Sequence, residues 1–277
     1  MPELPEVEAA RRVTAAMAVG RRIVGVWCAD DPIVFEGVSP RRIVAALRGR
    51  RVRAVRRHGK HFWLELDARP WLLVHFGMTG GVHVPKRPSL RLKSSHGAPA
   101  GWPPRFLKLK LTFDDGAELA IADGRRLGRI RLRHDPRTEP PLSGLGFDAF
   151  HELPSSARFH ELLTARNAPI KAVLLDQSFA AGVGNWIADE VLYQARIAPK
   201  RRARTLTRQE SARLRSRLRA VLATAIRSGS DGDRFPRTWL FHHRWDHDPL
   251  ARTASGARLR WETVGGRTTA WAPSVQR

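Results

Sequence analysis

The sequence predicts an α+β fold, in which an N-terminal helix and an antiparallel β-sandwich precede a helical region. Three observations support this class. Apolar side chains recur at helical spacing in residues 1–19, short runs alternate apolar and polar residues between 21 and 133, and helical spacing returns after residue 141. The 277 residues suffice for one large domain or two ordinary ones, with an apolar core.

Alternation identifies the strands of the first half. Residues 106–113 and 129–133 alternate as half-buried strands do, whereas residues 62–66 and 71–76 look more deeply buried. The sequence DDG at residues 114–116 is typical of a hairpin turn between strands. These signals predict a mostly antiparallel sandwich.

Loop and helix signals organise the rest of the chain. The stretch 85–104 is rich in Pro, Gly and Ser and predicts a mobile loop, and the Pro-rich residues 136–141 predict a linker. TRQE at residues 207–210 fits a capping box, and two glycines at 265–266 predict a hairpin. The helix after the capping box has one apolar face and one basic face, for which simple solvation is the plainer explanation: Arg208, Arg213, Arg215, Arg217 and Arg219.

Composition narrows the function classes. Lys and Arg total 49 against 26 Asp and Glu, so the formal net charge of +23 favours a polyanionic partner, nucleic acid first and acidic membranes second. A general preference for surface arginine is the alternative.

Cys28 is the only cysteine, which excludes an intramolecular disulfide and a cysteine-based zinc site. No apolar run reaches the roughly 18–20 residues of a membrane span, and no signal-peptide pattern opens the chain. We therefore expect a soluble intracellular protein.

The opening MPELPEVE at residues 1–8 carries the strongest chemical signal. Because the second residue is small, Met1 should be removed, which leaves Pro2 with a free secondary amine. An α-amine has a pKa of about 7.7–8, so part of it is unprotonated at neutral pH and can attack the C1′ of a deoxyribose to form an iminium. Glu3 and Glu6 lie within one turn and can transfer protons. A plain helix N-terminus, with proline and acidic residues in its first turn, explains each residue singly.

This opening resembles that of the Fpg/Nei (formamidopyrimidine-DNA glycosylase) family. The resemblance implies that Pro2 is the nucleophile, that Glu3 donates the proton that opens the sugar, and that Glu6 supports them. RRHGKHF at residues 56–62 resembles the family segment with a phosphate-binding lysine, which assigns that role to Lys60. Taken alone, Lys60 is an exposed turn lysine.

Two further segments resemble the loops that enter the duplex. HFGMTG at residues 75–80 is similar to the family motif whose methionine fills the gap left by the extruded nucleotide, which implies that role for Met78. DGRRLG at residues 123–128 places Arg125 where the family arginine faces the orphaned base. Leu127 stands where many members carry an intercalating phenylalanine, so stacking is weaker here. Without the resemblance these are a core methionine and a basic turn.

The second half carries the remaining resemblances. PIKAVLLDQ at residues 169–177 with the following AGVGN resembles the family's helix-two-turn-helix, and it implies that Lys171, Gly184 and Asn185 contact DNA. Glycines permit a tight backbone there, and Asn185 can cap the following helix. Arg267 matches the arginine of the C-terminal hairpin, which resembles the zincless-finger variety of plant members, where packing replaces the metal.

The implied architecture has three parts. Residues 1–135 form a catalytic N-terminal domain, residues 136–238 a helix-two-turn-helix DNA-binding domain, and residues 239–277 a zincless-finger hairpin. The tryptophans Trp261 and Trp271 are expected to pack that hairpin. No metal or organic cofactor is expected, although three histidines lie near one another in the sequence: His242, His243 and His247.

The implied function is base-excision repair by a monomeric enzyme acting on double-stranded DNA, in the cytoplasm, nucleoid or nucleus. It would release formamidopyrimidines, oxidised pyrimidines and hydantoins, and then cleave the abasic site by β,δ-elimination. The short polar segment 227–235 predicts weak activity on 8-oxoguanine, because family members that retain this base close a long loop over it there. A non-catalytic damage-binding protein on the same fold and a basic RNA-binding protein are the alternatives.

Overall fold

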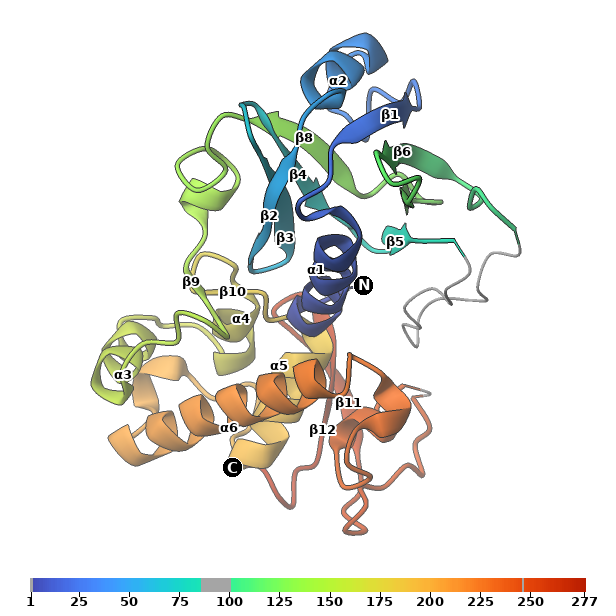
Figure 1. Ribbon diagram of the computed structural model, residues 1–277. Helices are drawn as coiled ribbons and strands as arrows, with labels where there is room; N and C mark the ends of the chain where they lie inside the picture. The colour runs from blue at the N-terminus through green and yellow to red at the C-terminus, as the bar shows by residue number, and fades with distance from the viewer. Residues whose placement is uncertain (1, 86–100, 246) are drawn as a thin grey trace. The chain divides into compact units, whose positions relative to one another are not determined.

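The computed structural model describes residues 2–85, 101–245 and 247–277. These form two compact units, Met1–Gly144 and Leu145–Arg277; Figure 1 shows both. The sequence placed the division after residue 135 and set residues 239–277 apart as a third domain. Most of the stretch predicted as a mobile loop lies outside the described residues.

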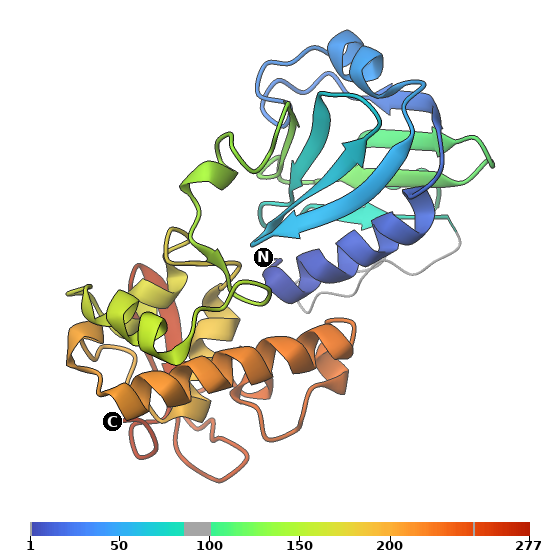
Figure 2. The same ribbon diagram turned by 60° about the vertical axis from the view of Figure 1, so that its left-hand side comes forward.

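The first unit contains helix α1 and two four-stranded antiparallel sheets, ordered β1-β6-β7-β5 and β2-β3-β4-β8. Figure 2 shows α1 in dark blue beside the strands of this unit. The elements are α1 (Leu4–Ala18), β1 (Ile23–Cys28), α2 (Pro40–Leu47), β2 (Val52–His58), β3 (His61–Leu66), β4 (Trp71–His75), β5 (Gly81–His83), β6 (Leu107–Phe113), β7 (Glu118–Ala122) and β8 (Arg129–Arg133). The predicted strands and the turn between β6 and β7 are confirmed.

Helix α2 is an element that strand periodicity did not predict. Pro40 stands in its first turn, and the Ser39 side chain accepts a hydrogen bond from the backbone of Arg42. Both are ordinary start signals of a helix. Ile43 and Leu47 bury the inner face of this short helix in the core of the unit.

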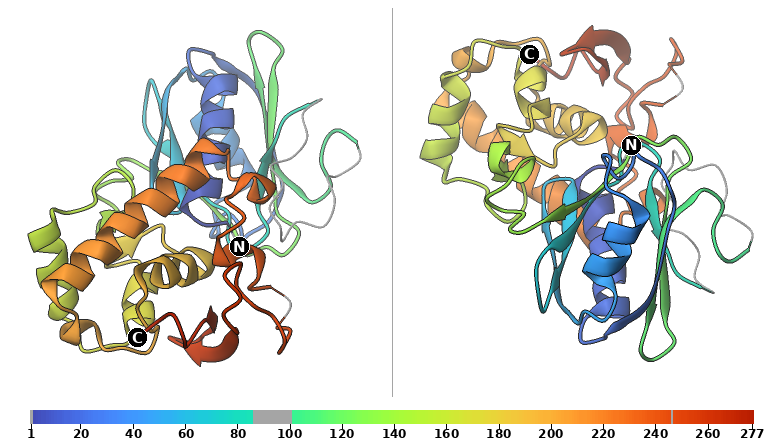
Figure 3. Two further views of the ribbon diagram at one scale, coloured as in Figure 1. Left: turned by 90° about the horizontal axis from the view of Figure 1, so that it is seen from below. Right: turned by 90° about the horizontal axis from the view of Figure 1, so that it is seen from above.

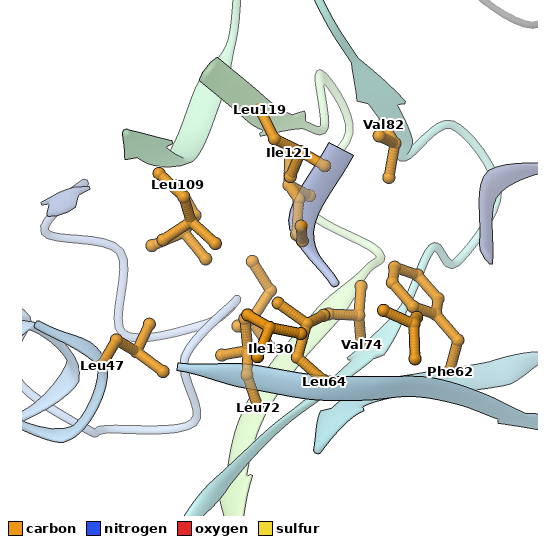
Figure 4. Close-up of a cluster of buried hydrophobic side chains, with 14 of the residues drawn as sticks. Leu47, Phe62, Leu64, Leu72, Val74, Val82, Leu109, Leu119, Ile121 and Ile130 are labelled. Carbon is orange, nitrogen blue, oxygen red and sulfur yellow. The ribbon is translucent and has the colours of Figure 1, made fainter. Parts of the chain in front are cut away.

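The two sheets share one apolar core (Figure 4). Alternation along each strand sends every second side chain inward, so the inward rows of both sheets meet there. One sheet contributes the first five of the following residues and the other the last four: Phe62, Leu64, Leu72, Val74, Ile130, Val82, Leu109, Leu119 and Ile121.

The second unit is mainly helical and ends in a β-hairpin, which Figure 3 shows in red. Its elements are β9 (Phe147–Asp148), α3 (Ser156–Thr164), α4 (Ile170–Leu175), β10 (Ala180–Ala181), α5 (Asn185–Ala195), α6 (Arg208–Arg227), β11 (Arg260–Val264) and β12 (Arg267–Trp271), with short 3₁₀ turns between them. The predicted capping box is confirmed, because Thr207 and Glu210 exchange hydrogen bonds at the start of α6. Helix α6 packs its apolar face on α5 and α3.

Candidate functional site

The start of α1 places two carboxyl groups directly beside Pro2. Pro2 is buried, and Glu3 and Glu6 are only 3% and 9% exposed. The backbone N–H of Glu3 donates to Glu6 Oε2 at 2.9 Å. Burial and the neighbouring Glu3 charge raise the pKa of Glu6 to about 7. A carboxyl group with this pKa can give or take a proton near neutral pH.

Lys60 lies in the turn between β2 and β3, and an ion-pair chain links this turn to α1. Glu8 Oε2 lies 3.1 Å from Arg57 Nε, and Arg57 Nη1 donates to the carbonyl of Gly59 at 2.9 Å. Lys60 follows Gly59 and is 8% exposed, so it is not the exposed turn lysine of the plainer alternative. Sequence reasoning missed the role of Glu8 and Arg57, although both lie inside the quoted motifs.

Met78 and Leu127 project from two loops that touch each other. Their exposed fractions are 38% and 40%, which is high for large apolar side chains. A Cβ atom built on Gly77 would lie 2.3 Å from the Leu127 backbone, so only glycine permits this approach of the loops. The two predicted wedge residues are therefore brought together on one surface.

Asp123 organises both loops. Its Oδ1 accepts hydrogen bonds from Thr79 Oγ1 at 2.7 Å and from the Arg125 backbone at 3.1 Å, and its Oδ2 accepts from the backbone of Gly128 at 2.7 Å. The carboxylate is 3% exposed, whereas Arg125 is exposed. One buried side chain thus fixes the backbone that carries Arg125 and Leu127.

Phe106 is an exposed aromatic residue beside these loops that sequence reasoning assigned only to a strand. Its ring is 54% exposed and lies where a Cβ on Gly124 would meet it at 3.1 Å. The Arg105 guanidinium lies 4.9 Å from the ring centroid. Phe106 has a positive φ of 59° and immediately precedes β6. Alternation along the strand does not predict that the side chain of Phe106 is so exposed.

The helix-two-turn-helix segment forms a tight turn before α5. Gly182 has a φ of 105°, and the Gln177 side chain braces the turn by accepting from the Gly182 N–H and donating to the carbonyl of Val183. The N-cap of α5 is Gly184. The prediction that Asn185 caps this helix is wrong, because Asn185 is the first helical residue and its Nδ2 donates to the carbonyl of Thr268 at 3.0 Å.

Lys171 differs most from its predicted role. Its side chain is completely buried and forms an ion pair of 2.6 Å with Asp189. Lys171 Nζ also donates to the Thr268 carbonyl and to Thr269 Oγ1 of β12. A fully buried ammonium cannot touch a DNA phosphate in this conformation, so direct contact by Lys171 is not supported.

Asp189 links α5 to the C-terminal hairpin. Its Oδ2 accepts from Arg244 at 2.6 Å and from the backbone of Ala270 at 3.2 Å. The next residue, Glu190, accepts from the backbone of Phe241 at 2.8 Å. These contacts hold the hairpin whose turn presents the exposed Arg267. The motifs that resemble the family did not point to Arg244.

Comparison with known protein families identifies the family of this chain. The models described as Formamidopyrimidine-DNA glycosylase N-terminal domain and Formamidopyrimidine-DNA glycosylase H2TH domain match residues 1–130 and 145–236. The chain belongs to the formamidopyrimidine-DNA glycosylase family. The resemblance seen in the sequence is thereby confirmed, and so is the α+β fold.

Relatives of this family match along the whole chain. The Formamidopyrimidine-DNA glycosylase of Arabidopsis thaliana is 40% identical over 282 residues, which cover 100% of this chain and 71% of the relative. The Thermus thermophilus protein is 34% identical over 288 residues, covering 100% and 98%. The chain is accordingly a formamidopyrimidine-type DNA glycosylase of base-excision repair, a class in which abasic-site lyase activity accompanies base removal.

Solved structures of formamidopyrimidine-DNA glycosylases have the same fold. The crystal structure of MutM (Fpg) from Thermus thermophilus matches with a TM-score of 0.77 and 34% identity over 99% of this chain and 98% of that one. A structure of MutM in complex with carbocyclic 8-oxo-G containing DNA matches with a TM-score of 0.81 and 25% identity over 100% of both chains.

The hairpin of this glycosylase is held by polar contacts and packing. Trp261 packs in a small cluster around Leu240, Leu259 and Ala272. The His247 ring stacks on the Trp261 ring, with 5.9 Å between the ring centroids. Among the described residues, which omit residues 86–100 and 246, no three His, Cys, Asp or Glu side chains are grouped to hold a metal ion. Within the same residues, no helix is long and apolar enough to cross a membrane.

Proposed function

We propose that this glycosylase removes oxidised bases from double-stranded DNA and cleaves the resulting abasic site through an iminium on Pro2. The observation that carries the proposal is the buried Glu3–Glu6 pair behind Pro2, with the pKa of Glu6 raised to about 7 by burial and by the charge of Glu3. Low exposure of the pair keeps water away from the proton transfers.

The steps follow from the chemistry of a secondary amine. Once Met1 is removed, the Pro2 nitrogen attacks C1′, the bond from C1′ to the damaged base breaks, and the base leaves with the proton that the amine loses. The nitrogen lone pair then forms the C1′=N bond of the iminium as the bond from C1′ to the ring oxygen breaks and Glu3 protonates that oxygen. The iminium acidifies the C2′ proton. Its removal expels the 3′ phosphate, and a second elimination expels the 5′ phosphate, so the strand is cut on both sides. Glu6 exchanges protons with Pro2 and Glu3.

The DNA contacts are proposed from the matching family motifs and from local geometry. Lys60 and Arg267 supply cations, and the N-terminus of α5 at Gly184 and Asn185 supplies backbone N–H groups to a phosphate. Binding that depends on phosphates falls as salt rises. Lys171 acts indirectly, by holding the hairpin that carries Arg267.

The exposed wedge serves base extrusion. Met78 and Leu127 fill the space that the extruded nucleotide leaves, and Arg125 faces the orphaned base. Inserted apolar side chains offset part of the few kcal/mol that unstacking costs. The buried Asp123 carboxylate holds both loops in register for this purpose.

The proposed substrates are formamidopyrimidines, oxidised pyrimidines and hydantoins, with weak release of 8-oxoguanine. Relatives were solved with Fapy-dG and with 8-oxo-G containing DNA. Here the segment after α6 is a compact turn, because the Ser230 N–H bonds back to Ala225 and a 3₁₀ turn follows at Gly232–Arg234. It leaves little chain to fold over an extruded purine. Release of 8-oxoguanine as fast as that of formamidopyrimidine in matched duplexes would refute the substrate assignment.

Borohydride trapping tests the chemistry. The wild type is expected to become covalently linked to a duplex with one abasic site and to yield β,δ-elimination products, because borohydride reduces the iminium to a stable bond. Pro2→Gly is expected to lose most of both, whereas the matched control Pro5→Ala keeps them, since Pro5 has no free amine. Binding without any cross-link in the wild type would instead favour a non-catalytic damage-binding protein.

A further inference from the structure

A basic pocket of about 860 Å³ lies in the second unit, at the carboxyl end of α5. Its lining includes Arg196, Arg213, Arg217 and Arg277. Asn185 stands at the opposite end of α5, which is about 15 Å long at 1.5 Å per residue. The pocket is therefore separate from the helix end and the turn proposed to hold DNA.

Local contacts fix two walls of this pocket. Arg213 Nε donates to the Ala195 carbonyl at 2.7 Å, which ties α6 to the last turn of α5. The backbone N–H of Arg277 donates to the Arg196 carbonyl at 3.2 Å, and the Ala198 N–H donates to the Arg277 carbonyl at 2.9 Å. The arginines thus project from three segments that are hydrogen-bonded to one another.

The charge of the pocket is unbalanced. Glu210 is the one side-chain carboxylate in the lining, and Arg201 holds it with bonds of 2.5 and 2.8 Å. Within residues 2–85, 101–245 and 247–277, no carboxylate pairs with any of the four lining arginines. Arg213 and Arg217 stand four residues apart on α6, a spacing at which like charges repel. One sign of charge in a concave site concentrates anions.

The other walls suit an organic ligand. Tyr193 and Trp239 supply aromatic surface, and Ser255 and Ser274 supply hydroxyl donors. A guanidinium group can donate two hydrogen bonds to two oxygens of one phosphate, and a nucleotide base can stack on an aromatic ring. The volume of the pocket lies in the range of small-molecule sites.

We propose that this pocket binds a nucleotide-sized phosphate ester with two or more negative charges, such as a nucleoside diphosphate. The phosphates lie on the arginines, and the base lies against Tyr193 or Trp239. The basic face of α6 is thereby partly a binding surface: Arg213 and Arg217 line the pocket, whereas Arg208 and Arg219 do not.

Calorimetric titration of ADP and of inorganic pyrophosphate tests the proposal. The protein is first saturated with a duplex that contains a stable abasic-site analogue, so that DNA-binding groups are occupied. Arg196→Gln/Arg217→Gln is expected to weaken ADP binding by at least about tenfold, since each lost guanidinium removes charge-assisted hydrogen bonds. Arg208→Gln/Arg219→Gln loses the same charge outside the pocket and is expected to bind ADP like the wild type.

Three outcomes would overturn the proposal. The first is no binding of either probe to the wild type. The second is equal loss of affinity in both double variants, which would mean that only net charge matters. The third is tighter binding of a glutamate-rich peptide of equal charge than of ADP, which would make the pocket a site for an acidic protein segment. Because the readout is binding, failure here leaves the proposed glycosylase chemistry untouched.

Discussion

Lys171 Nζ lies 2.6 Å from Asp189 Oδ1, and neither side chain is exposed to solvent. The second oxygen of the same carboxylate binds Arg244 at 2.6 Å. One buried anion is therefore shared by two cations, one from α4 and one from the segment that precedes the hairpin. Removing the anion would leave both cations buried and uncompensated.

Asp189→Asn is accordingly expected to destabilise the protein by about 3 kcal/mol, the cost of breaking a buried ion pair. Urea denaturation measures this loss as a lower midpoint. Glu161→Gln, which breaks the exposed pair with Arg158, serves as the control and is expected to change nothing measurable. An unchanged midpoint for Asp189→Asn would mean that the hairpin is held by packing alone.

The raised pKa of Glu6 is expected to make the stability of the protein depend on pH. Burial and the charge of Glu3 raise the pKa of Glu6 from 4.5 to about 7 in the folded state, so the folded protein keeps a proton that the unfolded chain releases. The contribution of this Glu6 proton to stability is complete below pH 4.5 and is lost as pH rises through about 7, a change of about 3 kcal/mol. Glu6→Gln should flatten this part of the profile, whereas Glu65→Gln should not. Parallel profiles for wild type and Glu6→Gln would contradict the assignment.

Asp123 predicts a selective effect on base removal. In Asp123→Asn an amide N–H₂ replaces one acceptor oxygen and faces a donor, which costs about 1–3 kcal/mol where the group is buried. We expect slower excision of a damaged base from duplex DNA, with smaller loss on a preformed abasic site, since little needs to be extruded there. Single-turnover rates on the two substrates measure the difference. Asp114→Asn, at an exposed turn, is the control.

An aromatic residue at position 127 is expected to increase the rate of base excision. Leu127→Phe should raise the rate of base excision about threefold to tenfold, because a ring stacks on the neighbouring base pair more strongly than an aliphatic side chain does. Leu127→Ala should lower it. Leu250→Phe makes the same exchange at a position that is 76% exposed in the second unit and should leave the rate unchanged. A slower Leu127→Phe enzyme would show that the gap fits only an aliphatic side chain.

Local patterns were sufficient where each element carries its own signal. Alternation predicted β6 and β8, and the capping box at Thr207 predicted the start of α6. The same reasoning failed for Asn185, because a side chain at the first position of a helix can cap it or bond elsewhere, and sequence does not say which. Its partner, the Thr268 carbonyl, lies 83 residues away.

The sequence by itself determined the family, through motifs spread along the chain, and the two secondary-structure regimes, which depend on neighbours within one or two turns. It also predicted that Pro2, Glu3 and Glu6 lie together at the start of α1. Only the tertiary structure decided the environment of Lys171. A lysine in a sequence is by default exposed, and its burial is possible only where distant groups neutralise it. Asp189 and the β12 residues do so here, and their approach results from the packing of α4, α5 and the hairpin.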